Sequence, residues 1–303
     1  MRFLTSVCIL LLVFTLSRAL VRFLPGDPIT TLLAETGSNL TAEALSHELG
    51  LDRPFFPALV QDLKKAVHLD LGRSLISREP IAPVLWRRFK NTLTLAAIAF
   101  ALTAVASLTL GLLAAEPSLG VVARVADRTC TLLGAITSAL PTPWIGPIFA
   151  YLFAFYWPIF PLGNHWALPA LVLALNLTGL WSRLIRERVR EVLLYGAARA
   201  ARARGLSEGR VLIKYGLVPA AGALVAFLGT QFGALLTGAF ITEIIFDWPG
   251  MGSFFIDAVL KRDYPTLEAC VLFGATASLA GTWAGDFARW MIDPRGREVK
   301  GTT

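Results

Sequence analysis

The chain has 303 residues, of which 55% are hydrophobic and 16% are charged, and its mean hydropathy is +0.62. Soluble domains carry about 25% charged residues, so this composition excludes a water-soluble domain, and 19 Phe and 8 Trp exclude intrinsic disorder. All three cysteines lie inside apolar runs and the three histidines are far apart, which excludes a disulfide scaffold and a thiolate or imidazole metal site. An integral membrane protein remains.

Six apolar stretches are long enough to cross a membrane as helices. A bilayer core about 30 Å thick requires about 20 apolar residues, because each helical residue rises about 1.5 Å. The predicted spans are Phe3–Leu24, Asn91–Ala115, two helices within Thr129–Ser182, Tyr215–Thr242 and Leu267–Ile292. The stretch Thr129–Ser182 contains no charged side chain, and the segment Trp157–Asn164 predicts the turn between its two helices. We therefore expect six transmembrane helices and an all-α integral membrane fold.

The first span also has features of a signal peptide, since Arg2 precedes an apolar segment. It lacks a small-x-small cleavage site, however, and Arg18 and Arg22 interrupt its end. A retained transmembrane helix is therefore the expectation. The two arginines at its end are expected to extend toward the outer lipid headgroups.

The distribution of Lys and Arg predicts the orientation of the chain. With the N-terminus inside, the segments on the cytoplasmic side hold 16 basic residues, nine of them in Arg183–Lys214, whereas the two short outer loops hold two. Long translocated segments largely escape this rule. Both termini are therefore expected in the cytoplasm. The same bias accounts for most of the net charge of +7, so nucleic-acid binding is not needed to explain it.

The predicted organisation has four parts: a first transmembrane helix (1–24), an external segment (25–90), a core of five transmembrane helices (91–292) and a cytoplasmic tail (293–303). The external segment has a Pro-Gly-Asp-Pro turn at 25–28 and a helix that is expected to begin at Thr41 as N-cap. It is too short and too interrupted for an independent catalytic domain. We therefore expect a small cap over the outer helix ends.

The inner loop Arg183–Lys214 is the most informative segment outside the predicted spans. Leucines and valines recur among its arginines at helical spacing. Five alanines between Ala197 and Ala203 precede Gly205, which is expected to end a helix with a positive φ, and Ser207 is a candidate N-cap for the next helix. A solvated loop that binds anionic lipid remains an alternative. The alanines favour a protein partner, because small side chains let its backbone approach closely.

The motif in this loop resembles the cytoplasmic coupling motif of binding-protein-dependent ABC importers, Glu-Ala-Ala followed after three residues by Gly. It reads Arg199-Ala200-Ala201-x-x-x-Gly205, with arginine in place of the glutamate. The segment Arg199–Leu206 is similar to the version found in the subfamily that transports dipeptides, oligopeptides, nickel and glutathione.

Further segments resemble the first, B-type, permease subunit of that subfamily in their order and spacing. They are Leu24–Pro28, Leu49–Pro54, Leu69–Ser74, Phe246–Gly252, Lys261–Pro265 and Asp293–Arg295. Two departures concern the lining of the pore. The proline expected after the coupling glycine falls at Pro219, one residue from the general pattern, and the motif that ends at Pro141 is followed by a second proline, Pro143.

The resemblance implies the type I ABC importer permease fold and a multi-pass protein of the bacterial inner membrane. Its partners would be a second homologous permease, two cytoplasmic ATP-binding subunits, an extracytoplasmic solute-binding protein and the lipid bilayer. ATP and Mg²⁺ would bind to the ATPase subunits and no cofactor to this chain, since it lacks G-x-x-x-x-G-K-[ST]. The chain would be a transport subunit and not an enzyme. Peptides are the most common implied cargo, and nickel, glutathione or another small solute stay open.

Two functions from other classes compete with an ABC permease. A secondary transporter would usually show repeated halves, interrupted helices and charges within the membrane, and the chain shows no obvious two-fold repeat. A membrane-embedded enzyme would need a catalytic constellation, and the chain has neither H-E-x-x-H nor G-x-S-x-G. The ABC permease is therefore the preferred interpretation.

Three groups of residues are assigned roles by their location. The coupling motif comprises Arg199, Ala200, Ala201, Arg202, Gly205 and Leu206. The candidates for the translocation path are the polar residues Ser138, Asn176, Gln231 and Glu243. The candidates for docking of the solute-binding protein are Trp248, Pro249, Gly250, Asp263 and Tyr264.

Each group has an alternative interpretation. The arginines at 199, 202 and 204 are expected to pair with an acidic rim on an ATPase subunit, but positive-inside charge alone would also place them here. Glu243 could mark the edge of a loop. The outer loop that holds the docking candidates could be a re-entrant hairpin that only braces the pore.

Overall fold

The computed structural model describes residues 2–23, 54–68, 70–140, 142–161, 163 and 165–292. Within these residues the regular elements are helices, and β pairing is limited to one bridge between Arg73 and Pro80. The predicted turn at 25–28, the predicted N-cap at Thr41, the motif at 49–53 and the tail from Asp293 lie outside the described residues. An all-helical fold is confirmed for the described part of the chain.

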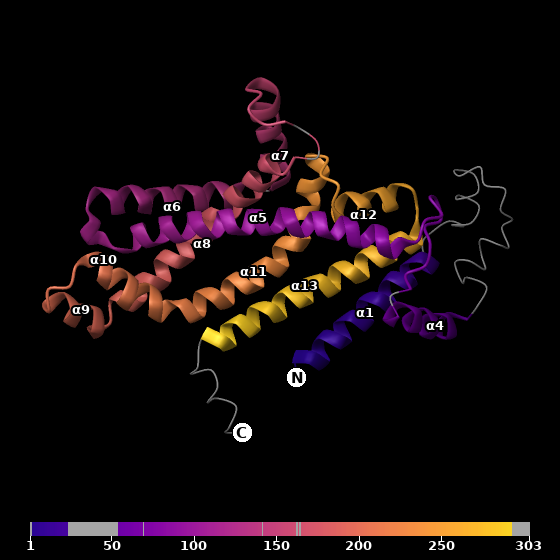
Figure 1. Ribbon diagram of the computed structural model, residues 1–303, viewed down its shortest axis with the longest axis horizontal. Coiled ribbons are helices and arrows are strands. Elements are labelled where there is room, and N and C mark those ends of the chain that lie inside the picture. The colour runs from indigo at the N-terminus through magenta and orange to yellow at the C-terminus, as the bar shows by residue number, and fades with distance from the viewer. Residues whose placement is uncertain are drawn as a thin grey trace. The chain divides into compact units, whose positions relative to one another are not determined.

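The chain divides into two compact units (Figure 1). The first comprises Met1–Thr92 and Pro249–Leu279, and the second comprises Leu93–Trp248 and Ala280–Thr303. The first unit holds α1 (Arg2–Phe23), α4 (Phe55–Val67), the beginning of α5 (Ile81–Ala115), α12 (Met251–Leu260) and the first half of α13 (Tyr264–Ile292). The remainders of α5 and α13 belong to the second unit.

The second unit is arranged around α8 (Ala167–Leu193), whose inward face is buried along most of its length. Helices on several sides contact it, because its small and aliphatic side chains allow close packing. The other elements of this unit are η1 (Pro117–Leu119), α6 (Val121–Ala139), α7 (Thr142–Ala150), η2 (Tyr151–Tyr156), α9 (Gly196–Ala203), α10 (Glu208–Val211), η3 (Leu212–Leu217) and α11 (Val218–Ile245). Figure 1 shows α9 and α10 together at one end of α8.

Four of the described helices are long and apolar enough to cross a membrane: Ile81–Ala115, Ala167–Leu193, Glu208–Leu236 and Tyr264–Ala288. The pair Val121–Ala139 and Pro143–Tyr156, bent by 105°, gives a fifth candidate if it counts as one span. Helix α1 contributes a shorter apolar segment, Leu4–Ala19. Five predicted spans each coincide with a helix, whereas the first of the two predicted within Thr129–Ser182 is divided between α6 and α7. The count of six membrane crossings stays a prediction.

Several helices extend beyond the apolar runs that predicted them, and α6 begins at Val121 and not at Thr129. Helix α5 begins at Ile81 and not at Asn91, so the predicted boundary at residue 90 falls inside a helix, and α8 continues past Ser182 to Leu193. The reason is that a charged residue ends an uncharged run without breaking backbone hydrogen bonding. Arg, Lys and Leu are good helix formers, so the helix continues through them.

Glycine pairs set the closest helix crossings in the second unit. A Cβ at Gly179 of α8 would lie 2.7 Å from the backbone nitrogen of Gly134 in α6. On α11 and α13, a Cβ at Gly281 would lie 2.9 Å from the Cα of Gly233, and Gly229 meets Gly285 more closely still. The second crossing thus brings together two G-x-x-x-G motifs, whose lack of side chains lets the helix backbones touch.

Candidate coupling site

A sharp break separates α8 from α9. The helix ends after Leu193, and Tyr195 adopts an extended backbone conformation with ψ 155° before α9 begins at Gly196. Leu194 and Tyr195 are 76% and 64% exposed at this corner. Helix α9 therefore projects as a short separate helix with two bulky apolar side chains at its root.

Helix α9 has a buried face and an exposed face. Ala198 and Ala201 are buried and belong to a hydrophobic cluster with residues of α8, α10, η3 and α11. Their small size lets α9 lie close to the helices beneath it. The exposed side chains of α9 and its C-cap are those of Ala197, Arg199, Ala200, Ala203 and Arg204. The exposed face of α9, defined by these five residues, is narrow at its centre and positively charged along its edge.

The end of α9 has the geometry of a Schellman motif. Gly205 has φ +80°, and its N–H donates to the Arg202 carbonyl oxygen at 2.9 Å, while the Leu206 N–H donates to the Ala201 carbonyl oxygen at 3.2 Å. Leu206 also packs against the buried cluster. The predicted positive φ is confirmed. Ser207 is the N-cap residue of α10 as predicted, although its side chain makes no capping hydrogen bond.

Arg202 differs from its two neighbouring arginines, because it pairs within the chain. Its Nη2 atom lies 2.6 Å from Glu116 and its Nε atom lies 3.0 Å from Glu208. The hydrogen bond to Glu208, with the charge of Glu116, raises the pKa of Arg202. Arg202 thus has two acidic partners inside this chain, and its expected pairing with a partner subunit stays a prediction, whereas Arg199 and Arg204 are exposed.

Sequence reasoning missed Glu116 and Glu208 as parts of this site. Glu116 directly follows the uncharged run that ends at Ala115, and its carboxylate is 4% exposed. An acidic residue that ends a membrane span on the side of a basic loop was a usable signal. Its pairing with Arg202 could not be derived, because the two residues are 86 positions apart.

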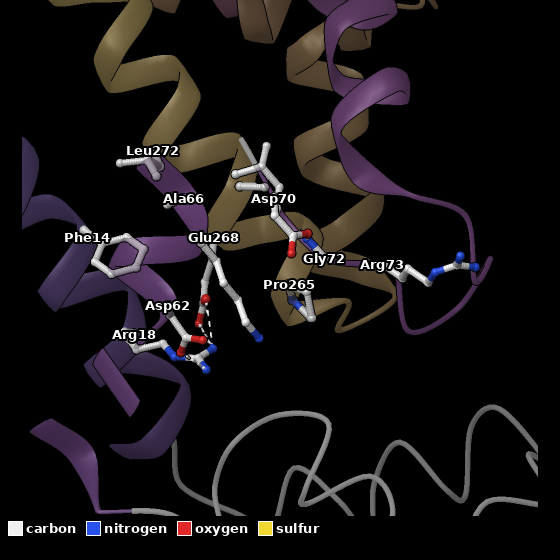
Figure 2. Close-up of a pocket in the computed structure, with 13 residues that line it drawn as sticks. Phe14, Arg18, Asp62, Ala66, Asp70, Gly72, Arg73, Pro265, Glu268 and Leu272 are labelled. Carbon is white, nitrogen blue, oxygen red and sulfur yellow. Dashed lines mark hydrogen bonds and ion pairs between the residues drawn. The ribbon is translucent and has the colours of Figure 1, made fainter. Parts of the chain in front are cut away.

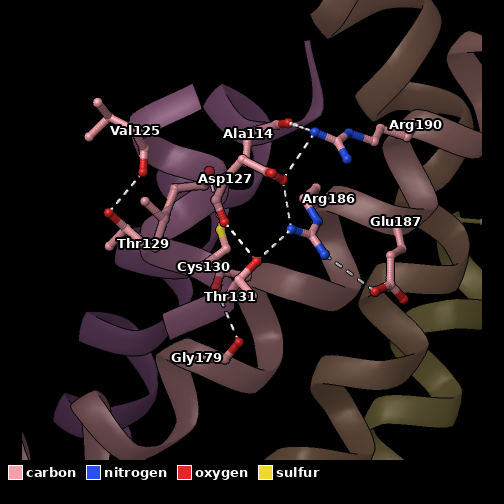
Figure 3. Close-up of polar contacts among 12 residues, drawn as sticks. Ala114, Val125, Asp127, Thr129, Cys130, Thr131, Gly179, Arg186, Glu187 and Arg190 are labelled. Carbon is pink, nitrogen blue, oxygen red and sulfur yellow. Dashed lines mark hydrogen bonds and ion pairs between the residues drawn. The ribbon is translucent and has the colours of Figure 1, made fainter. Parts of the chain in front are cut away.

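A second group of ion pairs joins α6 to α8 (Figure 3). Asp127 of α6 lies 2.7 Å from Arg186 and 3.1 Å from Arg190, both on α8. Arg190 also donates a 2.6 Å hydrogen bond to the carbonyl oxygen of Ala114, near the end of α5. Three helices of the second unit are thus tied together beside the coupling loop.

The candidates for the translocation path lie on three different helices of the second unit. Ser138 is exposed on α6, Asn176 is half-buried on α8 and Gln231 is half-buried on α11. Glu243 is fully buried near the end of α11, and its backbone carbonyl accepts a 2.8 Å hydrogen bond from the Trp248 N–H. Glu243 therefore does not occupy an exposed loop edge. The assignment of a path through these residues remains a prediction.

Most of the docking candidates are buried and make contacts within the chain. In the first unit, the buried Asp263 accepts hydrogen bonds from Ser74 Oγ at 2.5 Å, Leu75 N–H at 3.1 Å and Thr266 Oγ1 at 2.7 Å. Tyr264 beside it is also buried. These contacts join two of the motifs that the sequence singled out, and they favour the alternative of a bracing hairpin for Asp263.

The other docking candidates are braced in a similar way. Asn91 donates a 2.8 Å hydrogen bond to the Pro249 carbonyl oxygen, and the Met251 N–H donates to Thr92 Oγ1 at 2.7 Å, which fixes the backbone around Gly250. Trp248, in the second unit, is buried in a hydrophobic cluster. Side chains this enclosed hold the loop in shape.

The predicted position of Arg18 near the lipid headgroups stays a prediction, and its side chain is paired within the chain. In the first unit its guanidinium lies 3.0 Å from Glu268 of α13 and 2.5 Å from Asp62 of α4, at the edge of a cavity of about 250 Å³ (Figure 2). Two carboxylates on neighbouring helices compete with lipid for the charge, and a paired ion inside the protein needs no contact with headgroups.

Comparison with known proteins places this architecture in a family. A family model described as binding-protein-dependent transport system inner membrane component matches residues 107–298. The dipeptide transport system permease protein DppB of Escherichia coli strain K12 is 31% identical, with 94% of both chains covered. The oligopeptide transport system permease protein AppB of Bacillus subtilis strain 168 is 30% identical over 97% of both chains, and the glutathione transport system permease protein GsiC of Escherichia coli strain K12 is 31% identical over 83% of both.

Two solved structures share the fold. The MetNI methionine ABC transporter aligns with a TM-score of 0.61 at 18% identity, covering 71% of this chain and 99% of that chain. An amino acid ABC transporter with histidines aligns with a TM-score of 0.55 at 16% identity, covering 69% and 94%. The ABC importer permease fold is therefore confirmed. Because the family model matches more than half of the chain and relatives span nearly all of it, this protein belongs to the family of inner membrane components of binding-protein-dependent transport systems, as a multi-pass permease subunit.

Proposed function

We propose that this permease forms half of the path by which an ATP-driven importer carries di- or oligopeptides into the cell. A second, homologous permease completes the path, two cytoplasmic subunits bind ATP and Mg²⁺, and an external solute-binding protein delivers the cargo. The names of the relatives support peptides, because dipeptides, oligopeptides and glutathione are all short chains of amide-linked residues. Specificity for one peptide class is expected to reside mainly in the binding protein.

The exposed face of α9 is the observation that carries this proposal. Its alanines allow close backbone approach, Arg199 and Arg204 offer charge to an acidic cleft, and Leu194 and Tyr195 offer apolar area at its root. With both termini in the cytoplasm, this surface faces the ATPase subunits. A projecting helix with a rigid end can seat in a cleft of a partner and move with it when the ATPase pair closes.

The outer loop has a supporting role in the proposal. The buried contacts of Asp263 hold it in one shape, and the exposed neighbours Lys261 and Arg262 present charge around it. A preformed loop loses little conformational entropy when a solute-binding protein docks. Docking through these exposed neighbours, with the buried residues as braces, combines the two interpretations of this loop.

Purification of the tagged protein from its native membrane in a mild detergent tests the proposal. We expect a second permease and ATP-hydrolysing subunits to co-purify, and the complex in vesicles to take up a labelled dipeptide only with ATP and a binding protein. Competition by unlabelled oligopeptide, glutathione or Ni²⁺ then identifies the cargo class. A single-chain preparation that transports without ATP would overturn the proposal in favour of a secondary transporter.

A further inference from the structure

Arg202 lies where three elements of the second unit meet. It belongs to α9, one of its carboxylate partners directly follows the last residue of α5, and the other begins α10. Among the residues that the structure describes, the ion pairs of α9 are those of Arg202. The side chain therefore connects the projecting helix to two segments that precede and follow it in the chain.

The carboxylate of Glu116 is buried and held in place by contacts within the chain. It is 4% exposed, so water competes weakly for it, and its second role is to accept a 3.3 Å hydrogen bond from the Ser118 N–H at the start of η1. Arg190 of α8 holds the adjacent carbonyl oxygen of Ala114 at 2.6 Å. The end of α5 is thus held by two guanidinium groups, one from α8 and one from α9.

The covalent connection between α8 and α9 is less constrained. It passes through Leu194 and Tyr195, two exposed residues at a corner with an extended backbone. Helix α9 also contacts its neighbours through Ala198 and Ala201, whose small apolar side chains lie in the buried cluster. Apolar contacts of this kind are non-directional, whereas the charge-assisted pair between Arg202 and Glu116, whose side chain is 4% exposed, fixes the position of α9 relative to the end of α5.

We propose that Arg202 is a positioning residue that transmits the movement of α9 to α5 through Glu116 and to α10 through Glu208. This inference rests on the proposed function, and it assigns Arg202 a different role from direct contact with the ATPase. Helix α5 is long and apolar enough to cross a membrane, so a displacement at its end acts on a whole span. Coupling thus depends on the pair as a unit.

The substitutions Glu116→Gln and Arg202→Gln test this inference in the complete complex. Glutamine at 116 keeps an oxygen that can accept from the Ser118 N–H but loses the charge that holds Arg202. We expect each variant to assemble with its partners, while the amount of peptide transported per ATP hydrolysed falls about tenfold, a typical size for coupling between linked sites.

The double variant and a matched control make the test specific. If the pair acts as a unit, Glu116→Gln combined with Arg202→Gln is no worse than either single change, because the link is already lost. Glu191→Gln breaks the exposed pair between Glu191 and Arg188 on α8 and should leave the transport ratio unchanged. If Arg202→Gln uncouples transport but Glu116→Gln does not, the link from Arg202 to α5 through Glu116 is refuted and the inference is overturned.

Failure of this inference differs from failure of the proposed function. If the wild-type complex shows ATP-driven uptake and Glu116→Gln behaves like the Glu191→Gln control, only the role of the pair is refuted. If the wild type shows no ATP-driven uptake and recovers no ATPase subunit, the proposed function itself fails. Size-exclusion chromatography and thermal melting of each variant identify any loss of transport that comes from misassembly alone.

Discussion

At the scale of single residues, Gly205 is the position where the backbone requirement is most specific. Its φ of +80° costs an L-residue about 1–2 kcal/mol, although a Cβ there would meet nothing within 4 Å. The requirement is therefore one of conformation and not of space. Both backbone hydrogen bonds that end α9, donated by the N–H groups of Gly205 and Leu206, depend on this conformation.

Gly205→Ala is expected to strain the end of α9 and to lower transport several-fold. Gly205→Pro is expected to abolish coupling, because proline fixes φ near −65° and has no N–H to donate to the Arg202 carbonyl oxygen. Uptake of labelled peptide in vesicles measures the effect. Gly120→Ala is the matched control, because Gly120 also has a positive φ, of 63°, and an open surrounding. Substrate-stimulated ATP hydrolysis that stays normal in the Gly205→Pro complex, together with normal uptake, would remove α9 from the mechanism.

Arg18 provides a second prediction at this scale. Arg18→Gln leaves Glu268 and Asp62 without their shared cation, and breaking a largely buried pair costs about 3–5 kcal/mol. We expect a lower melting temperature in detergent, with part of the loss recovered in the Arg18→Gln/Glu268→Gln double variant. Arg188→Gln, which breaks an exposed pair, should cost less than about 1 kcal/mol. Equal melting temperatures for Arg18→Gln and Arg188→Gln would contradict the buried network.

Residue chemistry also shows where sequence reasoning succeeds and where it ends. The positive φ of Gly205 follows from local rules, because glycine is the residue that most readily adopts the left-handed conformation at the end of a helix. The ion pairs of Arg18 with Glu268 and of Arg202 with Glu116 do not follow from local rules, since these partners lie far away in sequence. Charge signs and burial were readable, whereas the choice among possible partners needed the packing of the helices.

At the scale of elements, the crossing of α11 and α13 depends on glycines that make no polar contact. The effect of close packing can be separated from that of helix propensity by making the same Gly→Ala substitution at two positions of α11. Gly229→Ala places a methyl group against the backbone of Gly285 and is expected to cost about 1–3 kcal/mol. Gly238→Ala, in open space on α11, should be neutral or stabilising by up to about 1 kcal/mol.

Thermal melting of the two variants decides between these expectations. A drop for Gly229→Ala with no drop for Gly238→Ala supports the close crossing. Equal effects would mean that the helices stand further apart than the structure places them. The G-x-x-x-G spacing on both helices was visible in the sequence, but a spacing alone does not say which two helices meet.

Element boundaries were the least predictable feature. Apolar runs located every predicted membrane helix, yet α5 and α8 continue through charged residues beyond the ends of those runs. The bend of 105° after α6 also divides a stretch that reads as one uncharged span. Hydropathy reports the surroundings of a segment, whereas helix ends are set by backbone hydrogen bonds and by proline and glycine, and the two need not coincide.

At the scale of the whole molecule, the orientation predicted from basic residues can be measured directly. In a variant with its native cysteines replaced by serine, an impermeant maleimide added to intact cells should label Ile159→Cys, which is exposed between η2 and α8. It should label Ser207→Cys, exposed before α10, only after permeabilisation. Labelling of Ser207→Cys in intact cells would contradict the predicted orientation, because it would place α9 outside the cell.

The central claim is that the exposed face of α9 binds an ATPase subunit, and its most direct measurement is co-purification. Ala200→Trp adds a bulky side chain to this exposed face and leaves the buried cluster, to which Ala201 belongs, unchanged. We predict that the tagged variant keeps the second permease but loses the ATP-hydrolysing subunits, while Val122→Trp, at an exposed position of α6, retains both. Recovery of ATPase subunits with Ala200→Trp at the wild-type level would contradict the account.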